Sequence, residues 1–116
     1  MSDEIVKKYS EIKLKVGLNS NNIPLEMHWS AADGDVENAP VKAVLFSVWD
    51  PIEKNTMKID LWTKDMPVEE MKRFYIDCLG GLAQSALTST GDEYISNEIN
   101  SLCEKLVKHI KKENKG

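Results

Sequence analysis

The sequence predicts an α+β fold, in which a small antiparallel sheet is covered by two long C-terminal helices. The sheet is expected to hold an N-terminal hairpin plus a third strand. Two observations predict this class. Apolar residues alternate with polar ones at residues 12–29 and 57–61, which is typical of half-buried strands. At residues 68–110 apolar residues instead recur every three or four positions, as in amphipathic helices. The expected element order is β-β-(α)-β-α-α.

The first hairpin is predicted at residues 10–18 and 23–30. Between these strands lies Asn19-Ser20-Asn21-Asn22, whose residue types tolerate the left-handed backbone of a tight turn. Pro24 cannot donate to a strand ladder, so we expect it at the start of the second strand or on an outward-facing edge. The alternating apolar residues of the two strands are Ile12, Leu14, Val16, Leu18, Ile23, Leu25, Met27 and Trp29.

Residues 31–49 are the hardest part of the chain to assign. Residues 31–40 are rich in acidic residues and predict a loop. In residues 41–49, Val41, Val44, Leu45 and Val48 fit helical spacing. That spacing favours a helix, although alternation across the same residues leaves a strand open. Pro51 ends the element in either case, because the residue before a proline is pushed out of the α region.

The second half of the chain begins with a predicted strand at residues 56–63. The first long helix is expected to open at Pro67. Gly80 and Gly81 lie inside this helix, where they predict close packing against another backbone, with a kink in the helix as the alternative. Thr90 followed by Glu93 is a capping-box pattern that predicts the start of the second helix. The apolar stripe of that helix is Ile95, Ile99, Leu102, Cys103, Leu106 and Ile110.

The chain of 116 residues predicts one domain, residues 1–116, with flexible termini at 1–9 and 112–116. We found no apolar run near the roughly 18 residues of a membrane span and no signal-peptide pattern, so we expect a cytoplasmic protein without membrane insertion. Cys78 and Cys103 occupy apolar helix positions and are expected to be buried, reduced thiols. All but one of the 19 acidic residues precede residue 105, and this acidic body argues against a nucleic-acid partner.

Groups that could carry chemistry are sparse. The two histidines, His28 and His109, lack a positioned partner, so we expect no catalytic residue, no cofactor and no metal, and therefore no enzyme. Trp62 falls on the polar side of its strand, where another part of the chain or a partner must cover it. An exposed tryptophan is a strong anchor for protein binding. The candidate partner-binding residues are Lys58, Asp60, Trp62, Lys64 and Asp65.

A long run closely resembles the gliding motility protein GldC family of Bacteroidota. Residues 47–72 read SVWDPIEKNTMKIDLWTKDMPVEEMK, similar to that family's WD…NT…IDLWTKDMPV signature. The opening SEIK at residues 10–13 and the Thr90-Gly91 break also resemble the family. The resemblance implies a small accessory protein associated with gliding motility and its secretion apparatus, with no catalytic residue or cofactor to carry over.

Two functions follow as hypotheses. The first is a non-enzymatic accessory protein that binds a protein component of the motility or secretion machinery. The alternative is a small-ligand-binding domain with its pocket between sheet and helices. Outward Glu11, Lys13 and Lys15 discourage pairing along the N-terminal hairpin edge, so we expect a monomer or a weak homodimer.

Overall fold

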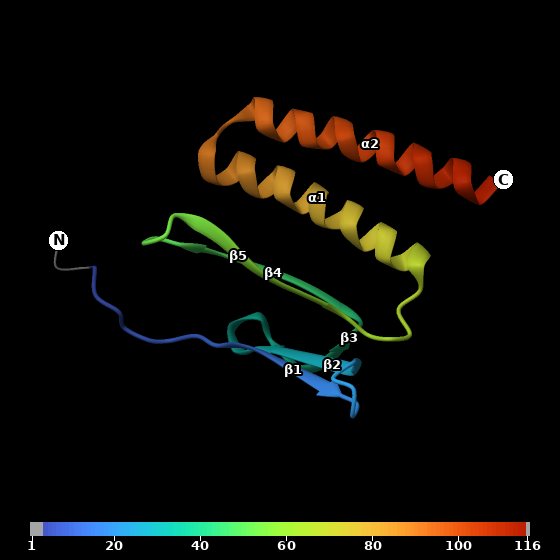
Figure 1. The fold of residues 1–116 in the computed structure, drawn as a ribbon. Helices are drawn as coiled ribbons and strands as arrows, with labels where there is room; N and C mark the ends of the chain where they lie inside the picture. Colours follow the sequence, from blue (N-terminus) through green and yellow to red (C-terminus); the bar gives the residue numbers. More distant parts are fainter. Residues whose placement is uncertain (1–3, 116) are drawn as a thin grey trace. The chain divides into compact units, whose positions relative to one another are not determined.

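The computed structural model describes residues 4–115, which form antiparallel strands followed by two helices (Figure 1). The predicted α+β class is confirmed. The chain divides into two compact units, Met1–Met66 with the strands and Pro67–Gly116 with the helices. The elements are β1 (Ile12–Leu18), β2 (Pro24–Ala31), the short 3-10 helix η1 (Ala32–Gly34), β3 (Val36–Val41), β4 (Ala43–Asp50), β5 (Asn55–Trp62), α1 (Val68–Thr90) and α2 (Glu93–Lys115).

The first three strands form one antiparallel sheet in the order β1-β2-β3. The predicted hairpin is confirmed, since β1 pairs with β2 along its length. The turn between them is held by Asn19, whose Oδ1 accepts the N–H groups of Asn21 at 2.8 Å and Ile23 at 3.1 Å. Asn22 has a φ of 62°, the left-handed backbone that the asparagine run predicts. Pro24 is the first residue of β2, one of the two places expected for it.

The prediction of a loop at residues 31–40 was wrong for most of that segment. Val36–Val41 is β3, an edge strand that pairs antiparallel with β2. Its register shifts between Trp29 and Ala31, and Asn38 has a φ of 51°. The N–H of Asn38 donates to Ser30 Oγ at 2.9 Å instead of continuing a regular ladder. An irregular edge strand that contains a proline carries no alternating pattern, which is why the sequence suggested a loop.

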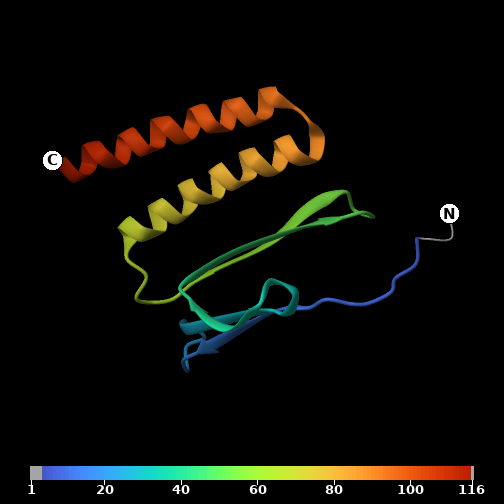
Figure 2. The same ribbon diagram turned by 180° about the vertical axis from the view of Figure 1, so that it is seen from behind.

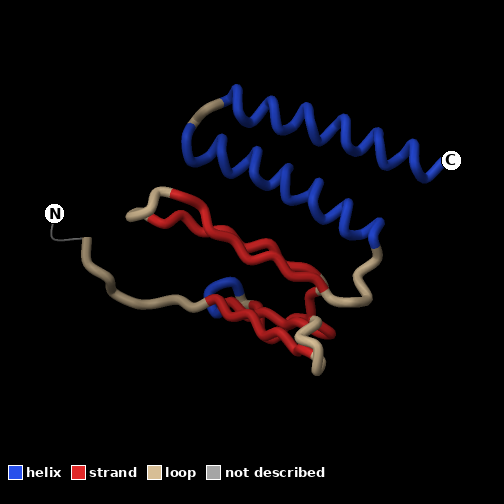
Figure 3. Tube along the Cα trace, viewed as in Figure 1, coloured by secondary structure: helices blue, strands red, loops and turns tan. Residues whose placement is uncertain are grey.

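The prediction of a helix at residues 41–49 was also wrong. Ala43–Asp50 is β4, which forms a two-stranded antiparallel sheet with β5 (red in Figure 3). The register runs without a shift from Ala43 opposite Trp62 to Asp50 opposite Asn55. A run of β-branched and aromatic residues fits helical and strand spacing equally well, and pairing with β5 decides for the strand. The expected stop at Pro51 is confirmed, because β4 ends one residue earlier.

The two helices form an antiparallel pair (Figure 2). Small buried residues lie on both helices, Ala83 of α1 at 1% exposure and Ser96 of α2 at 4%. Between the helices, Cys103 Sγ donates to the carbonyl of Ile76 at 3.9 Å. The close packing predicted at Gly80 and Gly81 is not found in the described residues, since a Cβ built at either position meets nothing within 4 Å.

The second helix starts at Glu93, two residues later than a cap at Thr90 predicts. Asp92 performs the capping, because its Oδ1 accepts the N–H groups of Tyr94 at 3.0 Å and Ile95 at 3.2 Å. The Thr90 hydroxyl instead donates to the Ala86 carbonyl and accepts the Asp92 N–H. Gly91 between them ends α1 with a φ of 73°, a left-handed conformation that favours glycine.

The ends of the chain lie partly outside the described residues. Residues 4–9 have no helix or strand, whereas α2 runs through Lys115. The flexibility predicted for 1–9 and 112–116 stays a prediction. Among residues 4–115, neither long helix has the length and apolar character that crossing a membrane requires.

Candidate functional site

The polar face of β5 brings three of the predicted binding residues together. Because strand side chains alternate between faces, Lys58, Asp60 and Trp62 point to the same side. The Lys58 ammonium lies 3.0 Å from Asp60 Oδ2, an exposed ion pair. Trp62 is 50% exposed. Opposite on β4 are the smaller or apolar Ala43 and Leu45. The result is a half-exposed indole beside a charged pair.

The other two predicted residues, Lys64 and Asp65, lie in the turn that follows β5. The turn is built around Thr63, which is 2% exposed and donates its hydroxyl to Asp65 Oδ1 at 2.7 Å. The Met66 N–H closes the turn on the Thr63 carbonyl at 3.1 Å. The Lys64 N–H donates to the carbonyl of Pro24 at 3.0 Å, which fixes the turn to the start of β2. The backbone here is therefore held at several points.

Sequence reasoning missed Lys42, the residue that completes this corner. Its ammonium lies 2.7 Å from Asp65 Oδ2, and its carbonyl accepts the Thr63 N–H at 2.8 Å. The Lys42 hydrogen bond, followed by that from Thr63, lowers the pKa of the Asp65 carboxyl below its ordinary value. Lys42 is 23 positions from Asp65 along the chain. No local pattern signals the contact, and it becomes visible only once β4 is known to pair with β5.

The opposite side of the β4–β5 hairpin is an apolar face that the sequence did not predict. It alternates with the polar face, and each of its cross-strand pairs is apolar on both strands. Phe46 is 50% exposed, and its cross-strand neighbour Ile59 is 56% exposed. The face was missed because residues 41–49 were assigned to a helix. Its members are Val44, Phe46, Val48, Met57, Ile59 and Leu61.

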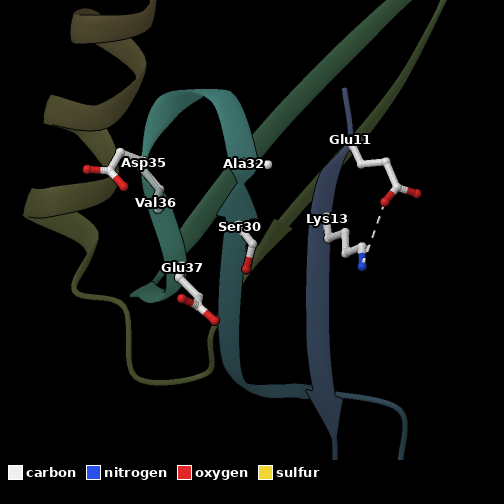
Figure 4. A pocket seen from close by; sticks show the side chains of 7 residues that line it. All are labelled: Glu11, Lys13, Ser30, Ala32, Asp35, Val36 and Glu37. Atoms are coloured by element: carbon white, nitrogen blue, oxygen red, sulfur yellow. Dashed lines mark ion pairs between the residues drawn. The ribbon is translucent and has the colours of Figure 1, made fainter. Parts of the chain in front are cut away.

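A depression of about 360 Å³ lies on the β1-β2-β3 sheet (Figure 4). Figure 4 shows Glu11 and Lys13 on one side, paired at 3.9 Å, and Asp35 and Glu37 on the other. Acidic groups therefore outnumber the single lysine. Its complete lining is Glu11, Lys13, Ser30, Ala32, Asp35, Val36 and Glu37. Within the described residues, no cluster of histidine, cysteine and carboxylate side chains suits a metal ion.

The cysteines are unpaired and partly buried. Burial, with a contribution from nearby Asp77, raises the pKa of the Cys78 thiol. A raised pKa leaves the thiol protonated at neutral pH, so it lacks the thiolate character of a reactive cysteine.

The strands and the helix pair define a small α+β protein whose candidate site is a tryptophan and ion-paired charges on a strand and its following turn. The family model for gliding motility-associated protein GldC-like matches residues 24–112. This chain belongs to that GldC-like family, and the resemblance found in its sequence is confirmed. No curated protein and no solved structure matches the chain.

Proposed function

We propose that this protein is a non-enzymatic accessory component of gliding motility that acts by binding another protein of the motility or secretion machinery. Membership of the GldC-like family supports the process. The observation that supports the mechanism is the exposure of Trp62, half of whose surface is free beside the Lys58–Asp60 pair. Tryptophan buries a large area on binding at a small entropic cost, and charged neighbours supply orientation.

The binding surface in this proposal contains Lys58, Asp60, Trp62, Lys64 and Asp65. Its rigidity supports the role, because Thr63 and the bonds around it hold the turn in one conformation. A surface that is already ordered loses little conformational entropy when a partner docks. The Lys58–Asp60 pair lies on the same face of β5 as Trp62 and presents both signs of charge to the partner, and a second ion pair, Lys42–Asp65, lies at the turn that follows β5.

Catalysis has no part in the proposal. Strongly shifted carboxyl pKa values often mark active sites, but here each lowered pKa has a structural cause. In Asp50 the cause is the backbone amides of Glu53 and Ile52 in the β4–β5 loop. In Asp65 it is Lys42, and in Glu113 it is Lys72, which bridges α1 and α2 at 3.0 Å. We place the protein in the cytoplasm, where a reducing environment suits two free cysteines.

The test is affinity capture from the native host with tagged wild type, Trp62→Ala and a matched control. Tyr94→Ala is the control, because it removes an aromatic side chain that is 73% exposed and belongs to α2 rather than to the strands. We expect a motility or secretion component to be captured by wild type and Tyr94→Ala and to be lost with Trp62→Ala. Capture of the same component by Trp62→Ala at wild-type level would contradict the assigned surface.

A motility assay in cells tests the role in gliding motility separately from the role of the Trp62 surface. In a host lacking this protein, we expect colony spreading to be restored by wild type and by Tyr94→Ala but not by Trp62→Ala. Normal spreading without the protein would contradict the role in motility. Spreading restored fully by Trp62→Ala would leave that role intact and reject the Trp62 surface.

A further inference from the structure

The two sheets have four edge strands, and β4 is the one that lacks any device against pairing with another chain. β1 carries Lys13 and Lys15, β3 carries Pro40 and an irregular register, and β5 carries a charged pair. Lysines, prolines and bulges are the usual means by which an edge is kept unpaired. Between Ala43 and Trp49, β4 has no charge, no proline and no register shift. Among residues 4–115, no strand other than β5 pairs with it.

One hydrogen bond shows which residues of β4 direct their N–H and C=O groups toward the free edge. The Lys42 carbonyl accepts the Thr63 N–H across the ladder at 2.8 Å. Residues that bond across an antiparallel pair alternate along the strand. The even-numbered residues of β4 therefore bond to β5, and the odd-numbered ones direct their N–H and C=O groups outward. The outward-directed residues are Ala43, Leu45, Ser47 and Trp49.

We propose that β4 pairs antiparallel with β4 of a second copy of this chain, with Phe46 opposite Phe46 across a two-fold axis. This register sets Leu45 against Ser47 and Ala43 against Trp49 of the other copy. It therefore pairs every outward N–H and C=O group of both strands. A two-fold symmetric interface of this kind closes on itself and does not propagate into fibres.

The charges at the ends of β4 fit the same register. Counting outward from the Phe46 pair, Lys42 of one copy falls opposite Asp50 of the other. Opposite charges directly across an antiparallel ladder attract each other. Residues 43–49 carry no charge in either copy, so the pairing places no like charges opposite each other. The hydrogen-bonding pattern and the charges at the strand ends therefore favour the same register, the one with Phe46 opposite Phe46.

The proposal also supplies the two-stranded β4–β5 sheet with additional strands. A two-stranded sheet alone is marginal in water, and additional strands stabilise it. Pairing of the two β4 strands gives a four-stranded sheet in which the apolar faces defined above lie on the same side. On the other face, Trp49 of one copy lies over Ala43 of the other, whose small side chain leaves room for the indole beside Trp62. Trp49 is 64% exposed in the single chain.

The first test measures the mass of the full chain by size-exclusion chromatography with light scattering, up to about 1 mM to include weak complexes. We expect wild type to approach twice the 13.1 kDa of one chain as concentration rises. Ser47→Pro removes an outward N–H and leaves the bonds to β5 in place, so the dimer is lost. Ser47→Ala is the matched control and retains it. A wild type that stays monomeric throughout, or a Ser47→Pro dimer as strong as wild type, overturns the proposal.

Leu45→Lys is a second variant designed to disrupt the dimer, and it is used if Ser47→Pro fails to fold. Lysine at this position faces Asp60 within the same hairpin, so the single chain tolerates it. The introduced charge protects the edge in the way that natural edge lysines do. We expect this variant to be monomeric with an unchanged circular dichroism spectrum. A folded Leu45→Lys variant that dimerises like wild type overturns the proposal as well.

Cross-linking then tests the register. In a chain with Cys78→Ala and Cys103→Ala, two variants are made, Ala43→Cys and Trp49→Cys. In the proposed register these cysteines face each other between copies at a Cα separation of about 5.5 Å, which a disulfide spans. Copies of one variant place their cysteines about 20 Å apart. We expect a disulfide-linked dimer from the mixture and none from either variant alone. Absence of the link in the mixture, or equal linking in a single variant, overturns the register.

Discussion

At the scale of single residues, the corner formed by Lys42, Thr63 and Asp65 supports the candidate site. The Asp65 carboxylate uses one oxygen for the Thr63 hydroxyl and the other for the Lys42 ammonium, each at 2.7 Å. Thr63 is buried, whereas Asp65 and Lys42 are largely exposed. Removal of either group is therefore expected to cost most stability where the Asp65 carboxylate is ionised, because both hydrogen bonds lower its pKa.

Asp65→Asn is expected to reduce the acid sensitivity of the fold. The folded pKa of Asp65 is lowered from its ordinary 3.8, so its contribution to stability is present above about pH 4 and is lost as pH falls through the folded value. Urea midpoints of wild type should fall on acidification through this window, and those of Asp65→Asn should fall less. Some dependence remains, because Asp50 and Glu113 have pKa values lowered in the same direction.

Thr63→Val is the comparison for that measurement. It keeps the side-chain shape and removes one hydrogen bond, which costs about 1 kcal/mol of unfolding free energy. We expect this loss at pH 7 and at pH 5 alike. Identical acid dependence of Asp65→Asn and wild type would contradict the role given to Asp65.

At the scale of elements, the start of α2 offers a direct comparison between two capping residues. Asp92 accepts two first-turn amides, whereas Glu93, the partner expected from the capping-box pattern, lies at the first helical position. We expect Asp92→Ala to lower the unfolding free energy by about 1 kcal/mol, the usual value of an N-cap. Asp92→Asn keeps an acceptor oxygen and should cost much less.

Denaturant unfolding followed by circular dichroism measures both variants. Glu93→Gln completes the set, because a capping box would make this position as sensitive as Asp92. We expect Glu93→Gln to change stability by less than about 0.5 kcal/mol. A larger loss in Glu93→Gln than in Asp92→Ala would restore the capping-box assignment.

Elements with one strong period could be predicted from the sequence, and those without it could not. β1, β2 and β5 alternate cleanly, and α1 and α2 carry long apolar stripes. β3 is an irregular edge strand with a proline, so its identity depends on pairing with β2. The apolar residues of β4 fit both helical and strand spacing, so only its pairing with β5 decides that it is a strand. The error at β4 also hid the apolar face and Lys42, because both follow from the β4–β5 register.

At the scale of the whole molecule, two different surfaces are assigned to one hairpin. The polar face of β5 with its turn is assigned to a partner protein, and the free edge of β4 to a second copy. Trp62 belongs to the first surface and Ser47 to the second, and they lie on different strands. In the dimer Trp62 lies beside Trp49 of the second copy, but it supplies none of the β4 backbone hydrogen bonds, so we expect Trp62→Ala to weaken the dimer far less than Ser47→Pro. Ser47→Pro should abolish the dimer, and Trp62→Ala should abolish partner capture and leave the dimer in place.

Tryptophan fluorescence can report the dimer directly. In the chain with Trp29→Phe and Trp62→Phe, Trp49 is the sole indole, and we expect its emission to move to shorter wavelength as concentration rises. The reason is that Trp49 leaves water and lies over Ala43 of the second copy. The companion chain that retains only Trp29, which is already partly buried in β2, should show no such shift. Because the same shift should disappear when Ser47→Pro is added, it ties the burial of Trp49 to the β4 edge. A Trp49 emission that is constant while the light-scattering mass doubles would place the dimer contact elsewhere on the chain.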